Sequence, residues 1–241
     1  MKFKTMSVHS GQRIDPQTGA LTTPLYQSST FSYFNAQAGK ERFAGQAPGF
    51  IYSRFGNPTT AELEQKLAAL EGADEALVVA SGMAAVSAIM YALADSGDEV
   101  AYIGPLYGGT DHVLANGLLG TSVTWATTET VGAATTPQTG LVFLETPANP
   151  SLDLVDIGAV VAQAGDVPVL VDNTFATPIL QNPIAHGATL VLHSATKSLG
   201  GHGDLLGGIV ATNGEWAARL RQIRALTGAV LYPMAAYAFH R

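Results

Sequence analysis

Apolar residues along the chain gather in short continuous runs that alternate with segments of helical spacing. The runs predict buried β-strands at Leu77–Ala80, Val100–Ile103, Ser122–Trp125, Leu141–Glu145, Val167–Asp172 and Leu190–His193. Helical patterns lie between most of them, as at Met83–Ala94 and Asp153–Ala164. This alternation predicts an α/β fold with a mainly parallel sheet covered by helices. Such sheets bind ligands at the carboxyl ends of their strands, so polar residues there are the first candidates for function.

Residues 1–58 lack this alternation, because glycines and prolines interrupt them, and we expect an extended N-terminal arm. From residue 59 the pattern changes. Thr59 and Glu62 have the spacing of a capping box, three leucines follow at helical spacing, and Gly72 stands where a C-terminal cap belongs. These signals predict a helix over 59–72, at the start of a large domain over 59–241.

Composition narrows the possible functions. The 241 residues are 47% hydrophobic, which suffices for a sizeable core. The net charge of −7, with scattered basic residues, argues against nucleic acid as a partner. Cysteine is absent and the six histidines lack metal-ligand spacing, so we predict no metal site and expect a cytoplasmic protein. The longest apolar stretch, Met83–Ala94, is too short to cross a membrane.

Lys197 is the only lysine after Lys66, and it follows the apolar run Leu190–His193 among small and hydroxyl residues. An amine becomes nucleophilic near neutral pH when desolvation or a cationic neighbour disfavours its charge, as the end of a strand in an apolar sheet can do. Amines of this kind form Schiff bases with carbonyl cofactors, chiefly pyridoxal phosphate (PLP). Lys197 is therefore a candidate catalytic residue.

Asp172 ends an aliphatic run, where a carboxylate is costly to bury unless a cation meets it. The protonated ring nitrogen of PLP is such a cation, and a carboxylate beside it keeps the ring able to accept electrons. The alternative interpretation is that Asp172 caps a turn or the next helix.

A phosphate site is predicted where the run ending at Ala80 passes through Ser81, Gly82 and Met83 into a helix, because helix N-termini attract anions. Ser81 has an alternative role as an N-cap of that helix. Hydroxyl groups at Ser194 and Thr196 are further candidates for the phosphate, although hydroxyls are common at strand ends.

Four other residues carry suitable groups. Tyr107, flanked by glycines, can lie against a planar ring or pack in the core. Asn149, between two prolines, can bond a ring hydroxyl or a substrate carboxylate, or serve as a turn residue. Tyr52 and Arg54 in the arm offer a phenol and a guanidinium for an anion, unless Arg54 pairs with one of the acidic residues.

Two rival motifs meet specific objections. Lys197 is preceded by Thr196 without the glycines that a Walker A loop requires. Ser194-Ala-Thr-Lys197 matches the Ser-x-x-Lys motif of penicillin-binding enzymes, but the companion Ser-Asp-Asn and Lys-Thr-Gly motifs are missing, so a serine acyltransferase is a weaker alternative.

Taken together, these segments resemble the Cys/Met-metabolism PLP-dependent enzymes over the whole chain. The matching segments are Tyr52-Ser-Arg54 with Asn57-Pro58-Thr59, Ser81-Gly82-Met83, Leu106-Tyr107-Gly-Gly-Thr110, Glu145-Thr-Pro-Ala-Asn149-Pro150, Val171-Asp172-Asn-Thr174 and His193-Ser194-Ala-Thr196-Lys197. The resemblance implies the PLP-dependent transferase-like fold of fold-type I for the large domain.

The resemblance also implies a role for each residue. Lys197 is expected to bind PLP as a Schiff base, Asp172 to pair with the pyridine nitrogen, and Tyr107 to cover the ring. As a separate hypothesis, Tyr107 is the candidate general acid for the departing thiol. The amides of Gly82 and Met83, with Ser194 and Thr196, are expected on the phosphate. Apart from the resemblance, Ser81, Asn149 and Thr174 are also candidates for binding the cofactor. Tyr52 and Arg54 are expected to reach the phosphate of a neighbouring subunit, which implies a homodimer as the minimum and a tetramer.

Within the family, Arg42-Phe-Ala-Gly-Gln, Gly201-His-Gly-Asp204 and Leu226-Thr-Gly-Ala-Val-Leu231 are most similar to methionine γ-lyases. Gly109 stands where methionine lyases carry a cysteine, and Arg224-Ala225 where they carry Lys-Asp. We therefore expect γ-elimination from a sulfur amino acid, giving a thiol, 2-oxobutanoate and ammonia. Cystathionine γ-lyase, cystathionine γ-synthase and O-acetylhomoserine sulfhydrylase activities are the alternatives.

The family has a smaller C-terminal domain that carries the arginine for the substrate α-carboxylate. Since the sequence ends at Arg241, we expect that domain to be absent. The non-enzyme alternative is accordingly a fragment that binds PLP without turnover.

Overall fold

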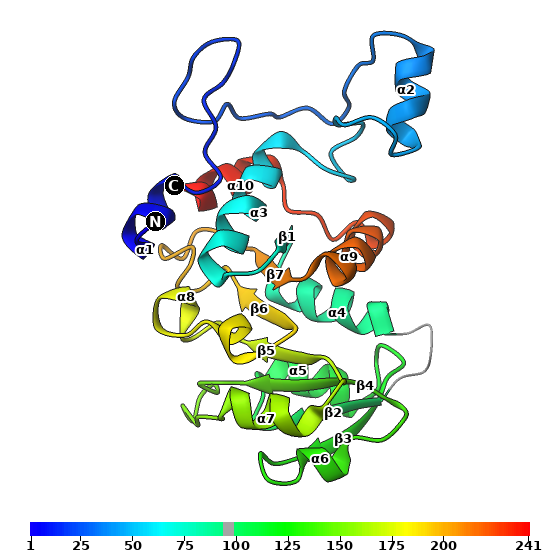
Figure 1. Cartoon of the computed structure of the whole chain (residues 1–241), viewed down its shortest axis with the longest axis vertical. Helices are drawn as coiled ribbons and strands as arrows, with labels where there is room; N and C mark the ends of the chain where they lie inside the picture. The colour runs from blue at the N-terminus through cyan, green and yellow to red at the C-terminus, as the bar shows by residue number, and fades with distance from the viewer. Residues whose placement is uncertain (94–98) are drawn as a thin grey trace.

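A computed structural model describes residues 1–93 and 99–241. Its centre is a seven-stranded sheet in the order β1-β7-β6-β5-β4-β2-β3 (Figure 1). The strands are β1 (Glu75–Val79), β2 (Glu99–Ile103), β3 (Ser122–Ala126), β4 (Thr139–Glu145), β5 (Val169–Asp172), β6 (Leu190–Ser194) and β7 (Gly208–Thr212). Each of the six predicted strands is present, with ends moved by a few residues. The α/β prediction is confirmed.

The sequence interpretation missed β7, which pairs antiparallel with both β1 and β6. It begins at Gly208 on the same connection that carries Lys197, without an intervening helix, so the expected alternation gave no sign of it. A Cβ atom at Gly208 would overlap the carbonyl oxygen of Ser81, so the close approach of β7 to the end of β1 requires glycine. The remaining neighbours pair in parallel.

Because β7 runs opposite to both of its neighbours, β1 points the same way as β6 and the other parallel strands. The carboxyl ends of β1, β6, β5, β4 and β2 therefore share one edge of the sheet. This edge brings together segments that follow residues 79, 194, 172, 145 and 103 in the sequence. It is the edge where a ligand site was predicted.

Helices cover both faces of the sheet. On one face, α4 (Gly82–Leu93), α5 (Gly108–Ala115) and α9 (Gly214–Thr227) contribute to a single core cluster, and α4 lies beside α9 (Figure 1). On the other face, α6 (Val131–Ala134) and α7 (Ile157–Ala164) pack over one half of the sheet, and α3 (Pro58–Glu71) and α10 (Pro233–His240) over the other half. The short helices α8 (Thr177–Leu180) and η1 (Pro183–His186) follow β5.

Helix α3 differs from the prediction at its start. The capping box at Thr59 and Glu62 is wrong, because Asn57 is the N-cap and its side chain accepts a hydrogen bond from the Thr59 N–H at 2.9 Å. Pro58 then occupies the first helical turn, which its fixed φ favours. The predicted end is confirmed, since Gly72 has φ 69° in the left-handed region.

The segment 1–58 is not wholly irregular, because it contains α1 (Phe3–His9) and α2 (Ala36–Phe43). Helix α1 contacts α3, and a Cβ at Gly11 would overlap the Glu62 carbonyl oxygen.

Helix α4 begins one residue earlier than predicted, and the predicted last residue, Ala94, lies outside the described residues. Among the described residues, no helix has both the length and the apolar character needed to cross a membrane.

Candidate functional site

A cavity of about 480 Å³ lies at the carboxyl edge of the sheet. Ten of the twelve residues predicted for the site line it: Ser81, Gly82, Met83, Tyr107, Asn149, Asp172, Thr174, Ser194, Thr196 and Lys197. They follow the ends of β1, β2, β4, β5 and β6, so the cavity depends on the strand order and not on any single motif. Tyr52 and Arg54 do not line it.

Asp172, the last residue of β5, is a buried carboxylate on the wall of this cavity. Its Oδ1 accepts hydrogen bonds from the Thr174 N–H at 3.0 Å and from the Thr174 hydroxyl at 2.5 Å. The alternative interpretation, that Asp172 caps a turn, is therefore also correct. Burial raises the pKa of Asp172 above its ordinary value, although the Thr174 hydrogen bonds and His193 lower it.

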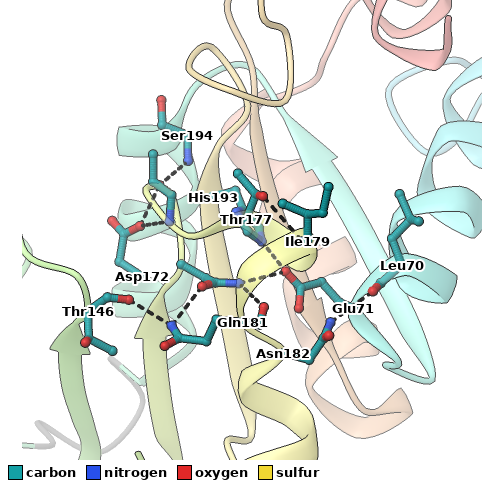
Figure 2. Close-up of polar contacts among 12 residues, drawn as sticks. Leu70, Glu71, Thr146, Asp172, Thr177, Ile179, Gln181, Asn182, His193 and Ser194 are labelled. Atoms are coloured by element: carbon teal, nitrogen blue, oxygen red, sulfur yellow. Dashed lines mark hydrogen bonds and ion pairs between the residues drawn. The ribbon is translucent and has the colours of Figure 1, made fainter. Parts of the chain in front are cut away.

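Thr174 connects Asp172 to the neighbouring strand. Its hydroxyl donates to Asp172 and accepts from the backbone N–H of Ser194 at 2.8 Å. Figure 2 shows Asp172 and the backbone of Ser194 linked through this connection. Both of these bonds to Asp172 use Oδ1, and no hydrogen bond to the second carboxylate oxygen is seen among the described residues.

The start of α4 forms the next wall. The Ser81 hydroxyl accepts a hydrogen bond from the Ala84 N–H at 3.1 Å, so the N-cap alternative holds for this residue. A Cβ at Gly82 would lie 3.0 Å from the Ser194 Cβ, which shows how closely the helix start approaches the end of β6. The N–H groups of Gly82 and Met83, at the first positions of the helix, lack intrahelical acceptors and can therefore bind an anion here.

Lys197 lies in the turn after β6 and is exposed. The expectation that the end of the strand would bury this amine is therefore wrong for the described chain, because the turn carries Lys197 three residues beyond Ser194. Its backbone N–H donates to the Ser194 carbonyl at 3.1 Å. The hydroxyl of Thr196 donates to the carbonyl oxygen of Gly207 and accepts from its N–H. This hydroxyl therefore also fixes the backbone of the residue that precedes β7.

Tyr107 immediately precedes α5, lines the cavity and is 46% exposed. The ring folds back over the start of its own helix, since a Cβ at Gly109 would lie 2.7 Å from Tyr107 Cε1 and 3.2 Å from Met83 Sδ. The core-packing alternative for Tyr107 is therefore excluded by its exposure.

Glu145 is the site residue that the sequence interpretation missed. It ends β4 directly opposite Asp172 in the strand register, and it is buried on the cavity wall. Its Oε1 accepts the Asn149 N–H at 3.0 Å and its Oε2 accepts the Tyr107 N–H. Burial, and then the carboxylate of Asp172, raise the pKa of Glu145 to about 7, against the lowering effect of the two N–H groups. The signal was available, because Glu145 ends a buried run as Asp172 does.

Tyr52 and Arg54 lie together in the arm. The Arg54 guanidinium is 5.6 Å from the centre of the Tyr52 ring and 4.8 Å from that of Phe55. It donates to the Ala225 carbonyl oxygen at 2.5 Å and thereby ties the arm to the end of α9. Tyr52 is 38% exposed. The alternative that Arg54 pairs with an acidic side chain is not seen among the described residues.

A buried polar network supports the site from the opposite face of the sheet (Figure 2). Glu71 at the end of α3 pairs with His193 through Oε1 and Nε2, and the same oxygen accepts from Asn173 Nδ2 at 3.1 Å. Asn173 and Gln181 exchange hydrogen bonds at 3.0 and 2.9 Å, and Gln181 also donates to the Thr146 carbonyl at 2.8 Å. His193 is thus part of a structural network.

The cavity fits pyridoxal phosphate by the chemistry of its groups. Asp172 is a buried carboxylate that has no cation among the hydrogen-bond partners described, which suits a protonated ring nitrogen. The start of α4 and the Ser194 hydroxyl offer donors for a phosphate, in a space that a side chain at residue 82 would fill. Lys197 supplies the amine. Among the described residues, no group of histidines and acidic residues is arranged to hold a metal ion.

Comparison with known proteins agrees with this chemistry. The model of the family described as "Cys/Met metabolism PLP-dependent enzyme" matches residues 4–241. An L-methionine gamma-lyase of Brevibacterium sandarakinum is 51% identical, and the match covers 100% of this chain and 64% of that protein. The corresponding protein of Brevibacterium aurantiacum is 50% identical, over 99% of this chain and 61% of that protein.

Among solved structures, metB from Corynebacterium glutamicum superimposes with a TM-score of 0.92 at 37% identity, over 100% of this chain and 63% of that chain. The chain therefore spans somewhat less than two thirds of the length of these relatives.

Proposed function

From the premise that the chain belongs to the Cys/Met metabolism PLP-dependent enzymes, we propose that the protein catalyses γ-elimination from methionine or a close sulfur amino acid. The products are a thiol, 2-oxobutanoate and ammonia, with one water consumed. The observation that carries the proposal is the buried carboxylate of Asp172 on the same cavity as the amine of Lys197. Relatives named L-methionine gamma-lyase at 51% and 50% identity favour methionine among the possible substrates.

Pyridoxal phosphate is the cofactor of this family, and when bound it supplies a carbonyl for the substrate amine and a protonated ring that accepts electrons. Lys197 would hold it covalently through Nζ, and Asp172 would hold the proton on the ring nitrogen. The N–H groups at the start of α4 and the hydroxyl of Ser194 would bind its phosphate.

The remaining groups act on the substrate. The Nζ of Lys197 would take the proton from the substrate Cα, give it up to the reacting system, and then take a proton from Cβ. The phenol of Tyr107 donates a proton to the departing sulfur. The side chain of Asn149, on the adjacent wall, binds a substrate carboxylate or a cofactor hydroxyl.

Cofactor binding is tested first. Titration of the protein with pyridoxal phosphate should produce a visible absorbance band that Lys197→Ala removes. Borohydride reduction followed by peptide mass analysis should place the label on Lys197. A label elsewhere, or no label, would contradict the proposal.

Substrate identity is tested next with three parallel assays: methionine, cystathionine, and O-acetylhomoserine with sulfide. Release of 2-oxobutanoate from methionine is the expected result. Release from cystathionine alone would instead favour a cystathionine lyase, and sulfide incorporation alone a sulfhydrylase. A PLP band without turnover in any assay would leave the cofactor-binding fragment as the correct description.

We propose further that Tyr52 and Arg54 complete the site of a second copy of the chain, so that a homodimer is the minimum and a dimer of dimers is the expected assembly. Their exposed positions outside the cavity of their own chain support this. Sedimentation analysis should show the oligomer, and Arg54→Ala should weaken PLP binding. A monomer with unchanged PLP affinity in that variant would refute this proposal. A cytoplasmic location is also proposed, on the lack of cysteine in the sequence.

A further inference from the structure

Glu145 carries two hydrogen bonds that join separate parts of the cavity. Its two carboxylate oxygens accept from the backbone N–H groups of Tyr107 and of Asn149, which lie in different connections. The first connection follows β2 and the second follows β4. One buried side chain therefore fixes the main chain beneath both of these cavity residues.

The chemistry of the side chain explains why glutamate stands here. A carboxylate offers two acceptor oxygens, so it can satisfy two N–H groups from opposite directions. Glutamine, of the same shape, has only one acceptor oxygen, and its NH₂ group would confront the second N–H. Among the described residues, neither the Tyr107 N–H nor the Asn149 N–H has a backbone acceptor, so each depends on Glu145.

Retaining a carboxylate at this position has a cost. Glu145 is 5% exposed and stands directly opposite the buried carboxylate of Asp172 in the register of β4 and β5. Two buried acids side by side disfavour each other's ionised form. Groups with this kind of unfavourable neighbour concentrate where a function requires them.

Building on the proposed function, we infer that Glu145 is a positioning residue that holds Tyr107 and Asn149 in place for the reaction. Through Tyr107 it sets the position of the ring and phenol on the cavity wall, and through Asn149 it sets the amide on the adjoining wall. Loss of these two bonds should therefore impair the reaction more than it impairs folding.

Hydrogen exchange followed by mass spectrometry tests this directly and needs neither cofactor nor turnover. The segment 147–150 is unusually informative, because Pro147 and Pro150 lack N–H groups and only Ala148 and Asn149 can exchange. In Glu145→Gln, exchange should accelerate roughly tenfold or more in segments 104–110 and 147–150, and not elsewhere. Asp156→Asn is the matched control, since the exposed Asp156 accepts the Ala159 N–H at 3.0 Å outside the cavity.

The kinetic arm uses the enzyme loaded with pyridoxal phosphate. Glu145→Gln should lower kcat/KM by roughly 100-fold, the scale of a misplaced reacting group, while Asp156→Asn leaves it unchanged. Unchanged exchange in both segments, or unchanged kcat/KM in Glu145→Gln, would overturn the inference. If exchange in Glu145→Gln rises along the whole chain, Glu145→Asp is used in place of that variant. The shorter carboxylate keeps the charge but cannot reach both N–H groups, and the same criteria apply.

The two arms separate this inference from the proposed function. A wild-type protein that releases no oxo acid from any of the three substrates refutes the proposed function alone. The exchange arm then still decides whether Glu145 holds the two segments.

Discussion

The buried pair of Glu71 and His193 offers the sharpest test of what stabilises the base of the site. Both side chains are 1% exposed, and the pair joins the end of α3 to β6. Replacing Glu71 with alanine removes the acceptor for His193 and one acceptor for Asn173 at once. The Nδ1 atom of His193 already lacks a partner among the described residues, so the imidazole would have none.

Breaking a buried pair by removing one partner typically costs about 3–5 kcal/mol, because the other partner is left desolvated. For a domain of this size each kcal/mol lowers the unfolding midpoint by roughly 2–4 °C, so Glu71→Ala should lower it by roughly 6–20 °C. The control is Glu75→Ala, whose ion pair with Arg221 has side chains 35% and 39% exposed. An exposed pair of this kind contributes about 0–1 kcal/mol.

The assay is a double-mutant cycle in urea, with Glu71→Ala, His193→Ala and the double variant, each followed by far-ultraviolet circular dichroism. The sum of the unfolding free energies lost in the two single variants should exceed the loss in the double variant, because each single substitution removes the same contact. The reasoning is refuted if Glu71→Ala costs less than about 1 kcal/mol, or if the two losses add within about 0.5 kcal/mol.

Three further predictions follow, two on the cavity and one on the start of β7. Asp172→Asn should weaken PLP binding by roughly 10- to 100-fold in an absorbance titration, because the charged acceptor for the ring nitrogen is lost; equal affinity would remove Asp172 from the proposed role. For Glu145, the pKa is raised from 4.5 to about 7, so its contribution to stability is complete below pH 4.5 and is lost as the pH rises through 7. Urea titrations from pH 4.5 to 8 should show this fall, of roughly 3 kcal/mol at most, in the wild type but not in Glu145→Gln. Gly208→Ala should destabilise the fold by several kcal/mol, because its Cβ would overlap the Ser81 carbonyl, whereas Gly214→Ala, with its nearest neighbour at 3.6 Å, should be near neutral by thermal unfolding.

The parts of this structure that were predicted correctly depend on local patterns. Continuous aliphatic runs such as Leu141–Glu145 become buried strands because both faces of a parallel sheet are covered. Polar residues that end such runs meet at one edge of the sheet. The run that ends at Asp172 and the run that precedes Lys197 therefore allowed the cavity to be located from the sequence.

The parts that were missed depend on contacts between distant residues. Glu71 and His193 are 122 positions apart, and no local sequence pattern predicts that they pair. Strand β7 was missed because its direction is set by β1 and β6 and not by a crossover helix. Asn57 replaced the predicted capping box because Pro58 fits the first turn of α3, a competition that the Thr59 and Glu62 pattern does not reveal.

The alternation of side chains along the strands separates the residues of the cavity from those that support the fold. Glu145, Asp172 and Ser194 continue the alternate positions that carry Phe143, Leu170 and Leu192, which pack in the core cluster containing α4. They therefore emerge on the cavity.

His193 and Asn173 have the opposite parity. They follow the positions of Val191 and Val171, which pack in the clusters on the other face. Their polar groups therefore meet Glu71 from α3 and do not line the cavity. A one-residue shift along a strand moves a side chain to the opposite face of the sheet. At this edge, the alternate position of a residue in its strand therefore separates cavity residues from residues of the structural network, and closeness to Lys197 in the sequence does not. Applied to the sequence alone, the same rule selects Glu145 beside Asp172 and assigns His193 to the structural network.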